Sequence, residues 1–204
     1  MAPVLKNGAD SAPFRLLLAH GAGAGMEHPV MEHLALGLAD GQLQVIRFEF
    51  PFMQQIRATG RRRPPDRAPK LMDYWRTVAT EFAHPRLYLA GKSLGGRMAS
   101  LVVDELRPQG LILLGFPFVP PANPQQYRGE HLATLATPTL LLQGERDRFG
   151  NKEQVANYAL SSQITTRWVP DGCHDFKPRK SSGTSHEANL DLMVAAMKEF
   201  IIND

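Results

Sequence analysis

The chain has 204 residues, of which 43% are hydrophobic and 21% are charged. These proportions are typical of a soluble globular protein and argue against disorder, and the length predicts one domain over residues 1–204. No apolar stretch approaches the roughly 20 residues that span a bilayer, and the N-terminal residues lack the apolar core of a secretion signal. We therefore expect a cytoplasmic protein with no membrane partner. The single cysteine, Cys173, excludes an intrachain disulfide.

Basic residues concentrate in one segment, residues 61–70, which contains Arg61, Arg62, Arg63, Arg67 and Lys70. The chain as a whole has a net charge of only +3, and no nucleic-acid-binding motif accompanies the segment. The sequence therefore predicts a solvated loop and no nucleic-acid partner. Attraction of an anionic substrate or partner is the alternative role for this loop.

Apolar runs alternate with helical patterns along the chain. The patterns predict strands at residues 14–19, 45–50, 86–90, 111–114, 139–143 and 164–169, and helices at 30–39, 71–82, 94–106, 155–160 and 187–202. Strands that are continuously apolar and alternate with helices indicate a mostly parallel sheet with helices on both faces. We expect an α/β fold with about six strands.

The sequence Gly91-Lys92-Ser93-Leu94-Gly95 lies between a predicted strand and a predicted helix. A serine nucleophile needs such a sharp turn to expose its hydroxyl, and the turn is so tight that the residues two before and two after must be small. A phosphate-binding loop would need a glycine five residues before Gly91, where Arg86 stands. Ser93 is therefore the candidate nucleophile. A glycine-rich turn with an incidental serine is the alternative.

A serine hydroxyl needs a histidine base, and the base needs an orienting carboxylate. In this architecture the expected chain order is serine, acid, histidine, with the last two on loops after later strands. Asp147 and His174 satisfy that order, and Glu145 competes with Asp147 as the acid. The other histidines, His28, His33, His84, His131 and His186, have no supporting context.

A glycine-rich run, His20-Gly21-Ala22-Gly23-Ala24-Gly25, follows the strand predicted at 14–19. Small residues let the backbone approach a substrate carbonyl, so we expect the backbone N–H groups of Ala22 and Leu94 to form an oxyanion hole. A dinucleotide site would need glycine at position 26, where Met26 stands. No cofactor and no metal are predicted. We interpret His20 as a buried residue that hydrogen-bonds its own loop.

Together these features resemble the α/β-hydrolase superfamily, and the resemblance covers most of the chain. Residues 20–23, 48–53, 62–65 and 91–97 are similar to the compact dienelactone-hydrolase-like branch that has bacterial members and animal chromatin-complex relatives. The resemblance implies triad roles for Ser93, Asp147 and His174. It departs from true dienelactone hydrolases, which carry a cysteine nucleophile. The residues before Phe14 are too few for the superfamily's first two strands, so we expect a trimmed sheet.

The connection after the strand at 111–114 is too short for a large helical cap, so an open site is expected. Apolar residues near the strand ends are candidates for its substrate-binding wall: Met26, Phe52, Met53, Phe116 and Phe118. Packing in the core is an equally good interpretation of Phe116 and Phe118.

The predicted function is hydrolysis of a small ester or thioester through an acyl-enzyme on Ser93. The substrate is the one small-molecule partner that the sequence predicts, and the oligomeric state stays open. A non-catalytic binding module with the same fold is the alternative. The presence of serine, acid and histidine together favours the enzyme.

Overall fold

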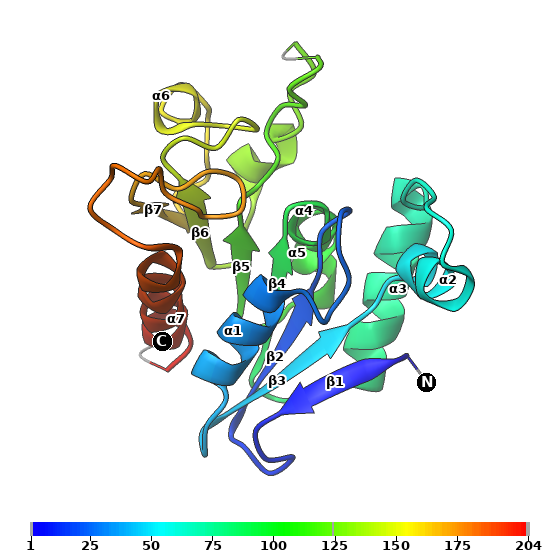
Figure 1. Ribbon diagram of the computed structural model, residues 1–204. Helices are drawn as coiled ribbons and strands as arrows, with labels where there is room; N and C mark the ends of the chain where they lie inside the picture. The colour runs from blue at the N-terminus through cyan, green and yellow to red at the C-terminus, as the bar shows by residue number, and fades with distance from the viewer. Residues whose placement is uncertain (1, 124, 203–204) are drawn as a thin grey trace.

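The computed structural model describes residues 2–123 and 125–202. A seven-stranded sheet in the order β1-β3-β2-β4-β5-β6-β7 forms its centre (Figure 1). The strands are β1 Val4–Asn7, β2 Phe14–Ala19, β3 Leu43–Phe48, β4 Leu87–Lys92, β5 Gly110–Leu114, β6 Thr139–Gly144 and β7 Ile164–Val169. The pairs from β3 through β7 are all parallel, and β1 is antiparallel to β3. The α/β fold with a mostly parallel sheet is thereby confirmed.

The strand β1 is the one that the sequence patterns did not predict. It has four residues and pairs at the sheet edge, where Val4 lies opposite Phe48 and Asn7 lies opposite Val45. So short a segment shows no clear apolar period, and its hydrogen bonds to β3 define it instead. The sheet therefore has one strand more than the six expected.

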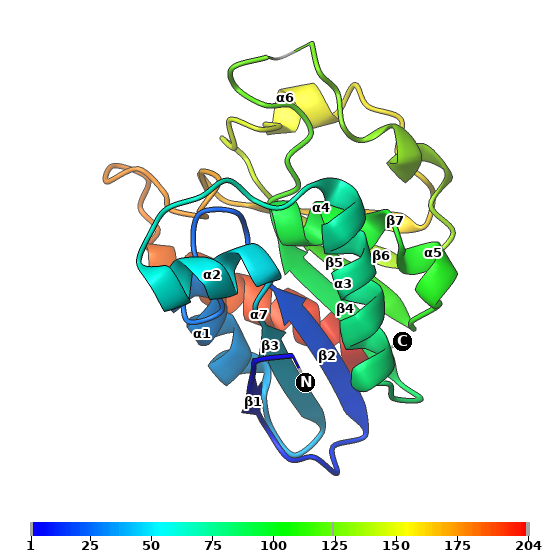
Figure 2. The same ribbon diagram turned by 90° about the vertical axis from the view of Figure 1, so that its right-hand side faces the viewer.

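Helices cover both faces of the sheet. They are α1 Pro29–Leu38, α2 Pro51–Thr59, α3 Ala68–Glu81, α4 Leu94–Ser100, α5 Val103–Leu106, α6 Lys152–Val155 and α7 His186–Ile202, with a 3-10 helix η1 at Glu130–Thr134. The helices α1 and α7 pack on one face, and α3 and α4 pack on the other. Figure 2 shows α3 in front of the sheet and α7 behind it. No described helix is long and apolar enough to cross a membrane.

The sequence of strand β2 is continuously apolar because both of its faces are buried. Leu16 and Leu18 face the core that contains α1 and α7, whereas Leu17 and Ala19 face the core that contains α3 and α4. All four side chains are fully buried. Each buried leucine contributes about 2 kcal/mol to folding through its apolar area. Burial on both faces therefore removes the polar positions that a half-exposed strand would show.

Three helices differ from the sequence expectation. The sequence patterns predicted no helix between residues 50 and 71, but Pro51 begins α2, a position where its missing N–H costs nothing, and the left-handed Gly60 (φ 65°) ends that helix. The helix expected at 94–106 is divided into α4 and α5. The helix expected at 155–160 was wrong except at Val155, because α6 spans Lys152–Val155, where Asn151 and Gln154 form a capping box at its start.

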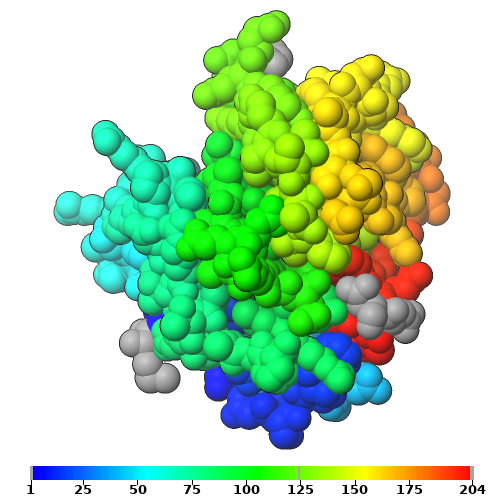
Figure 3. All heavy atoms as spheres, turned by 180° about the vertical axis from the view of Figure 1, so that it is seen from behind, coloured from blue at the N-terminus to red at the C-terminus, as the bar shows by residue number. Residues whose placement is uncertain are grey.

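Two of the segments that connect these elements bear on the site: the connection between β5 and β6 and the link between α2 and α3. Among the described residues between β5 and β6, η1 is the one helical element, which agrees with the expected absence of a large cap. The link between α2 and α3 is an extended, exposed segment that contains the three consecutive arginines. In the view from behind, the cyan to blue-green part of the chain projects at the left (Figure 3).

Candidate active site

Ser93 occupies the turn between β4 and α4 in a conformation that few residues with side chains adopt, with φ 49° and ψ −113°. Such backbone strain costs about 1–3 kcal/mol and persists only where the surroundings hold it. The neighbouring glycines make the turn possible. A Cβ on Gly91 would overlap the backbone of Gly96, and a Cβ on Gly95 would lie 2.5 Å from the His20 carbonyl oxygen. The glycines at both positions are therefore sterically required.

Hydrogen bonds from three elements fix this turn. The Ser93 N–H donates to the Leu114 carbonyl oxygen of β5 at 2.9 Å, and the Ser93 carbonyl oxygen accepts from the Arg97 N–H at 2.9 Å. From α3, the buried Trp75 indole N–H donates to the Gly95 carbonyl oxygen at 3.1 Å. These bonds hold the Ser93 hydroxyl in place at the carboxyl end of the sheet.

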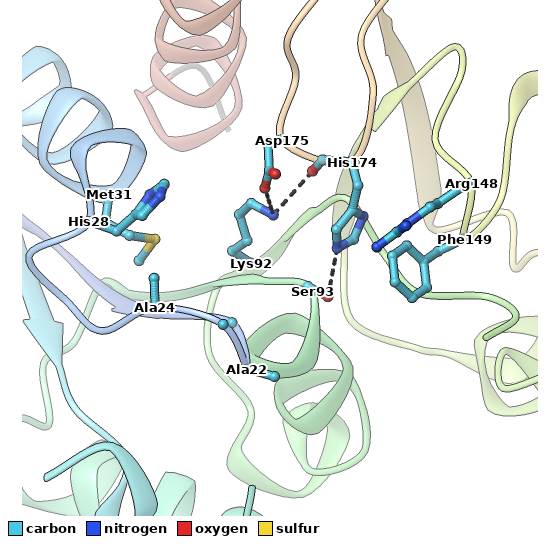
Figure 4. Close-up of a pocket in the computed structure, with 12 residues that line it drawn as sticks. Ala22, Ala24, His28, Met31, Lys92, Ser93, Arg148, Phe149, His174 and Asp175 are labelled. Carbon is cyan, nitrogen blue, oxygen red and sulfur yellow. Dashed lines mark hydrogen bonds and ion pairs between the residues drawn. The ribbon is translucent and has the colours of Figure 1, made fainter. Parts of the chain in front are cut away.

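A continuous chain of hydrogen bonds joins Ser93, His174 and Asp147. The Ser93 Oγ lies 2.9 Å from His174 Nε2, and His174 Nδ1 lies 2.8 Å from Asp147 Oδ2. Because a carboxylate can only accept, Nδ1 carries the hydrogen of the neutral imidazole and Nε2 accepts from the serine hydroxyl. Figure 4 shows the bond between His174 and Ser93 at the centre of the pocket. The structure thus brings together the three residues that the sequence singled out.

The carboxylate of Asp147 is fully buried and is held by several donors. Its Oδ1 accepts from the Phe149 N–H at 2.9 Å, and its Oδ2 accepts from the Gln143 side-chain amide at 3.1 Å. The same Gln143 accepts from the Phe116 N–H at 2.8 Å and donates to the Gly150 carbonyl oxygen at 2.9 Å. Gln143 therefore links the loops after β5 and β6, and it was not identified from the sequence.

The competing carboxylate, Glu145, lies away from His174. Its side chain accepts from the Asp171 N–H at 2.9 Å and pairs with Lys152 at 3.3 Å. The pKa of Glu145 lies below its usual value, chiefly because its carboxylate accepts the hydrogen bond from the Asp171 N–H. The Asp171 side chain in turn pairs with Arg146 at 2.7 Å. Asp147, and not Glu145, is the carboxylate that reaches the imidazole.

His20 is fully buried and fixes the glycine-rich loop, as its sequence context indicated. Its Nδ1 donates to the Gly21 carbonyl oxygen at 2.6 Å, and its Nε2 accepts from the Phe50 N–H at 3.0 Å. Burial lowers the pKa of His20. Both hydrogen bonds fit the neutral ring, so His20 acts as a structural link between the loops after β2 and β3.

The two backbone positions expected to form an oxyanion hole lie beside Ser93. A Cβ built on Gly21 would come within 3.6 Å of the Ser93 Cβ, so the glycine-rich loop passes directly against the serine. Ala22, the next residue, lines the same pocket as Ser93 and His174. Leu94 is the first residue of α4, where a backbone N–H has no partner within the helix. Both N–H groups therefore belong to segments that border the hydroxyl.

A pocket of about 330 Å³ opens above Ser93. The residues that line it come from the loops at the carboxyl ends of β2, β4, β6 and β7 and from the start of α1: Gly21, Ala22, Gly23, Ala24, His28, Met31, Lys92, Ser93, Arg148, Phe149, His174 and Asp175. In Figure 4, His28, Met31 and Ala24 lie on one side of Ser93, and Arg148 and Phe149 lie on the other. Several of these residues follow directly after Asp147 or His174 in the sequence, which is the signal that could have identified them.

The apolar residues expected to form the substrate wall lie elsewhere. None of Met26, Phe52, Met53, Phe116 and Phe118 lines this pocket, and none is more than 8% exposed. Phe116 and Phe118 pack against each other with ring centroids 4.8 Å apart, and Phe52 packs on the His20 ring. Phe52 and Met53 lie on the buried face of α2, and Phe116 and Phe118 follow β5. All four side chains turn into the core, where their large apolar area is removed from water.

The family comparison matches residues 12–202 to the alpha/beta hydrolase domain. The chain belongs to that family. The match to the α/β-hydrolases spans Ser93, Asp147 and His174 and agrees with the superfamily resemblance. It does not single out the dienelactone-hydrolase-like branch, which stays a prediction.

Solved structures of α/β-hydrolases have the same fold. An a/b serine hydrolase without lid from Xanthomonas campestris is 22% identical, with 98% of this chain and 88% of that chain covered and a TM-score of 0.70. An alpha-beta serine hydrolase homologue from Coxiella burnetii is 19% identical, with 96% and 89% covered and a TM-score of 0.64. Est1E from Butyrivibrio proteoclasticus, in a structure with bound ferulic acid, is 15% identical, with 98% and 94% covered and a TM-score of 0.69.

Proposed function

We propose that this α/β-hydrolase cleaves a small ester or thioester through an acyl-enzyme on Ser93. The observation that carries the proposal is the hydrogen-bonded chain from Asp147 through His174 to a serine hydroxyl on a strained turn. A strained backbone at a pocket floor is common where a group must be held ready to react. The similar structures described as serine hydrolases support the same reaction class.

In the proposed mechanism, His174 Nε2 takes the Ser93 proton while Oγ attacks the substrate carbonyl carbon. The oxyanion that forms accepts hydrogen bonds from the Ala22 and Leu94 N–H groups. The imidazolium then donates its proton to the departing alcohol or thiol. Water, deprotonated by the same imidazole, attacks the acyl carbon. The bond to Oγ then breaks, the imidazolium returns its proton to Oγ, and the acid is released. Throughout, Asp147 orients the imidazole and stabilises its positive charge.

The proposal is tested by labelling with a fluorophosphonate probe. We expect the probe to modify Ser93 in the wild-type chain and not in Ser93→Ala, since the probe reacts with activated serine hydroxyls. A folded Ser93→Ala variant that still carries the label and still turns over esters would contradict the proposal.

The pocket size predicts the preferred acyl group. A cavity of about 330 Å³ lies at the lower end of the range for ligand pockets, and the described residues of the β5–β6 connection form no large cap. We expect acyl chains of roughly two to six carbons to be preferred in a graded panel of p-nitrophenyl esters and acyl thioesters. An ester of ferulic acid belongs in the panel because Est1E holds that acid. A strong preference for chains above about ten carbons would contradict this expectation.

The alternative of a non-catalytic binding module makes the opposite prediction. A scaffold without catalysis has no need for a strained serine, a buried carboxylate and a bridging histidine at bonding distance. It would give no labelling and no turnover on any member of the panel, with the protein folded.

A further inference from the structure

Two cationic side chains line the pocket, Lys92 and Arg148, and they differ in whether a carboxylate pairs with them. Lys92 lines the pocket, but its ammonium pairs with Asp175 Oδ1 at 3.0 Å and donates to the His174 carbonyl oxygen at 3.1 Å. Burial raises the pKa of Asp175, but the Lys92 ammonium together with His174 and His28 holds that pKa below its usual value. These two charges compensate each other. Arg148 is different, because within residues 2–123 and 125–202 its guanidinium forms no ion pair and no hydrogen bond.

The backbone around Arg148 is fixed, although its side chain is exposed. The turn is closed by the Asp147 N–H, which donates to the Gly144 carbonyl oxygen at 3.1 Å, and by the Gly150 N–H, which donates to the Asp147 carbonyl oxygen at 3.1 Å. The Phe149 N–H donates to Asp147 Oδ1 at 2.9 Å. The residue that carries this guanidinium is therefore held by the same bonds that hold the triad carboxylate.

Ring contacts place the guanidinium beside the base. Its central carbon lies 5.2 Å from the centroid of the Phe149 ring, and that ring lies 4.3 Å from the centroid of the His174 ring. In Figure 4, Arg148 extends from the loop after β6 toward His174, on the side of Ser93 opposite to His28 and Met31. The Phe149 ring thus contacts both the Arg148 guanidinium and His174, the proposed proton donor.

The position of the base determines which part of a substrate meets this charge. His174 must donate a proton to the departing oxygen or sulfur, so the leaving group lies on the His174 side of the scissile bond. The acyl group then extends toward the other side of Ser93. A group that follows the leaving atom by several bonds therefore reaches Phe149 and Arg148.

On these observations, and on the proposed hydrolase function, we propose that the preferred substrates carry an anionic group on the alcohol or thiol that leaves. The planar guanidinium can bind a carboxylate or a phosphate with two hydrogen bonds. Phe149 offers an apolar face to the part of the leaving group between the anion and the scissile bond.

The test compares pairs of acetate esters that differ in the charge of the leaving group. The anionic members are 4-acetoxybenzoate and 4-acetoxyphenyl phosphate, and methyl 4-acetoxybenzoate is the neutral reference. The monophenyl ester of succinic acid, compared with phenyl butyrate, places the carboxylate on the acyl side instead. The variants are Arg148→Gln and Arg148→Lys. Arg62→Gln is the control, because Arg62 is also exposed, has no partner among the described residues and does not line the pocket.

The readout is the ratio of kcat/KM for an anionic ester to kcat/KM for its neutral reference. We expect Arg148→Gln to lower this ratio about tenfold for anionic leaving groups, as for one charged hydrogen-bonded contact, and Arg148→Lys to lower it less. The loss should shrink at high salt. The ratio for the acyl-side carboxylate should stay constant, and Arg62→Gln should change no ratio. A loss confined to one of the two anions would support the proposal and identify the recognised group.

Two results would overturn the proposal. One is an unchanged leaving-group ratio in Arg148→Gln, and the other is a loss confined to the acyl-side carboxylate. Both require a wild-type chain that labels on Ser93 and hydrolyses the neutral esters, so they would leave the hydrolase function intact. Absence of labelling and of turnover in the wild-type chain would instead contradict the proposed function and this proposal with it.

Discussion

Two charged regions of the molecule show how differently similar side chains can be used. At the carboxyl end of the sheet, Asp147 is fully buried and accepts hydrogen bonds from a backbone N–H, an amide and an imidazole. In the segment 61–70, Asp66 pairs with Arg63 and Lys70, while the neighbouring arginines are exposed. The region around Asp147 is distinguished by its network of hydrogen bonds, whereas segment 61–70 is distinguished only by its many basic residues. Charge density along a chain is therefore a weaker indicator of a site than convergence of charged groups in the fold.

The largest expected effect comes from the centre of the first region. We expect Ser93→Ala and His174→Ala each to lower kcat on the order of 10⁵-fold, because the two groups act as one unit. The double variant should lose little more than either single variant. Circular dichroism of each variant controls for folding, and a strictly additive double variant would contradict the coupled triad.

A second pair of variants separates the two carboxylates of the β6 loop. Asp147→Asn should lower kcat by up to about 10⁴-fold, because the amide no longer holds the imidazole in the required tautomer. Glu145→Gln should change kcat far less, since Glu145 bonds the Asp171 N–H and Lys152 instead. If Glu145→Gln proves the more harmful substitution in steady-state assays, the assignment of the acid is wrong.

The third prediction concerns Gln143, which supports the triad without touching Ser93. Gln143→Leu removes the donor to Asp147 Oδ2 and leaves the buried Phe116 N–H without its acceptor. We expect a loss of about 1–3 kcal/mol in the free energy of unfolding and a decrease in kcat smaller than that of Asp147→Asn. Urea denaturation and ester kinetics measure the two effects. Unchanged stability would show that Gln143 is not needed to hold these loops together.

The smallest effect is expected in the second region. Neutralising Arg61, Arg62 and Arg63 together should leave kcat/KM on neutral esters nearly unchanged, because none of the three lines the pocket. The measurement is kcat/KM for p-nitrophenyl acetate in the triple variant. A loss of more than tenfold, about 1.4 kcal/mol of barrier, would place this loop in the catalytic site.

The sequence predicted the parts of this molecule that local patterns determine. Continuous apolar runs predicted six strands of the sheet, and strand-turn-helix context together with chain order singled out Ser93, Asp147 and His174. It missed β1, whose four residues become a strand only through pairing with β3. It also placed Phe52 and Phe118 on the pocket wall, because the direction of a side chain after a strand end depends on packing that the local sequence does not specify.

The sequence also failed to indicate the roles of Gln143 and Arg148. Gln143 is the second-last residue of the apolar strand β6, and nothing in the sequence indicates its hydrogen bonds to two loops. The exposed Arg148 stands out only once its lack of a counter-ion among the described residues and its place on the pocket wall are known. Contacts between residues distant in the chain define both roles.

The most direct test of the proposed function is the detection of an acyl group on Ser93 during turnover. The chain is mixed with p-nitrophenyl acetate, quenched in acid and examined by intact and peptide mass spectrometry. We predict one added acetyl group on the peptide that contains Ser93, formed together with a burst of p-nitrophenol and absent in Ser93→Ala. Turnover with no acylated serine, or with the acetyl group on another residue, would contradict the proposed mechanism.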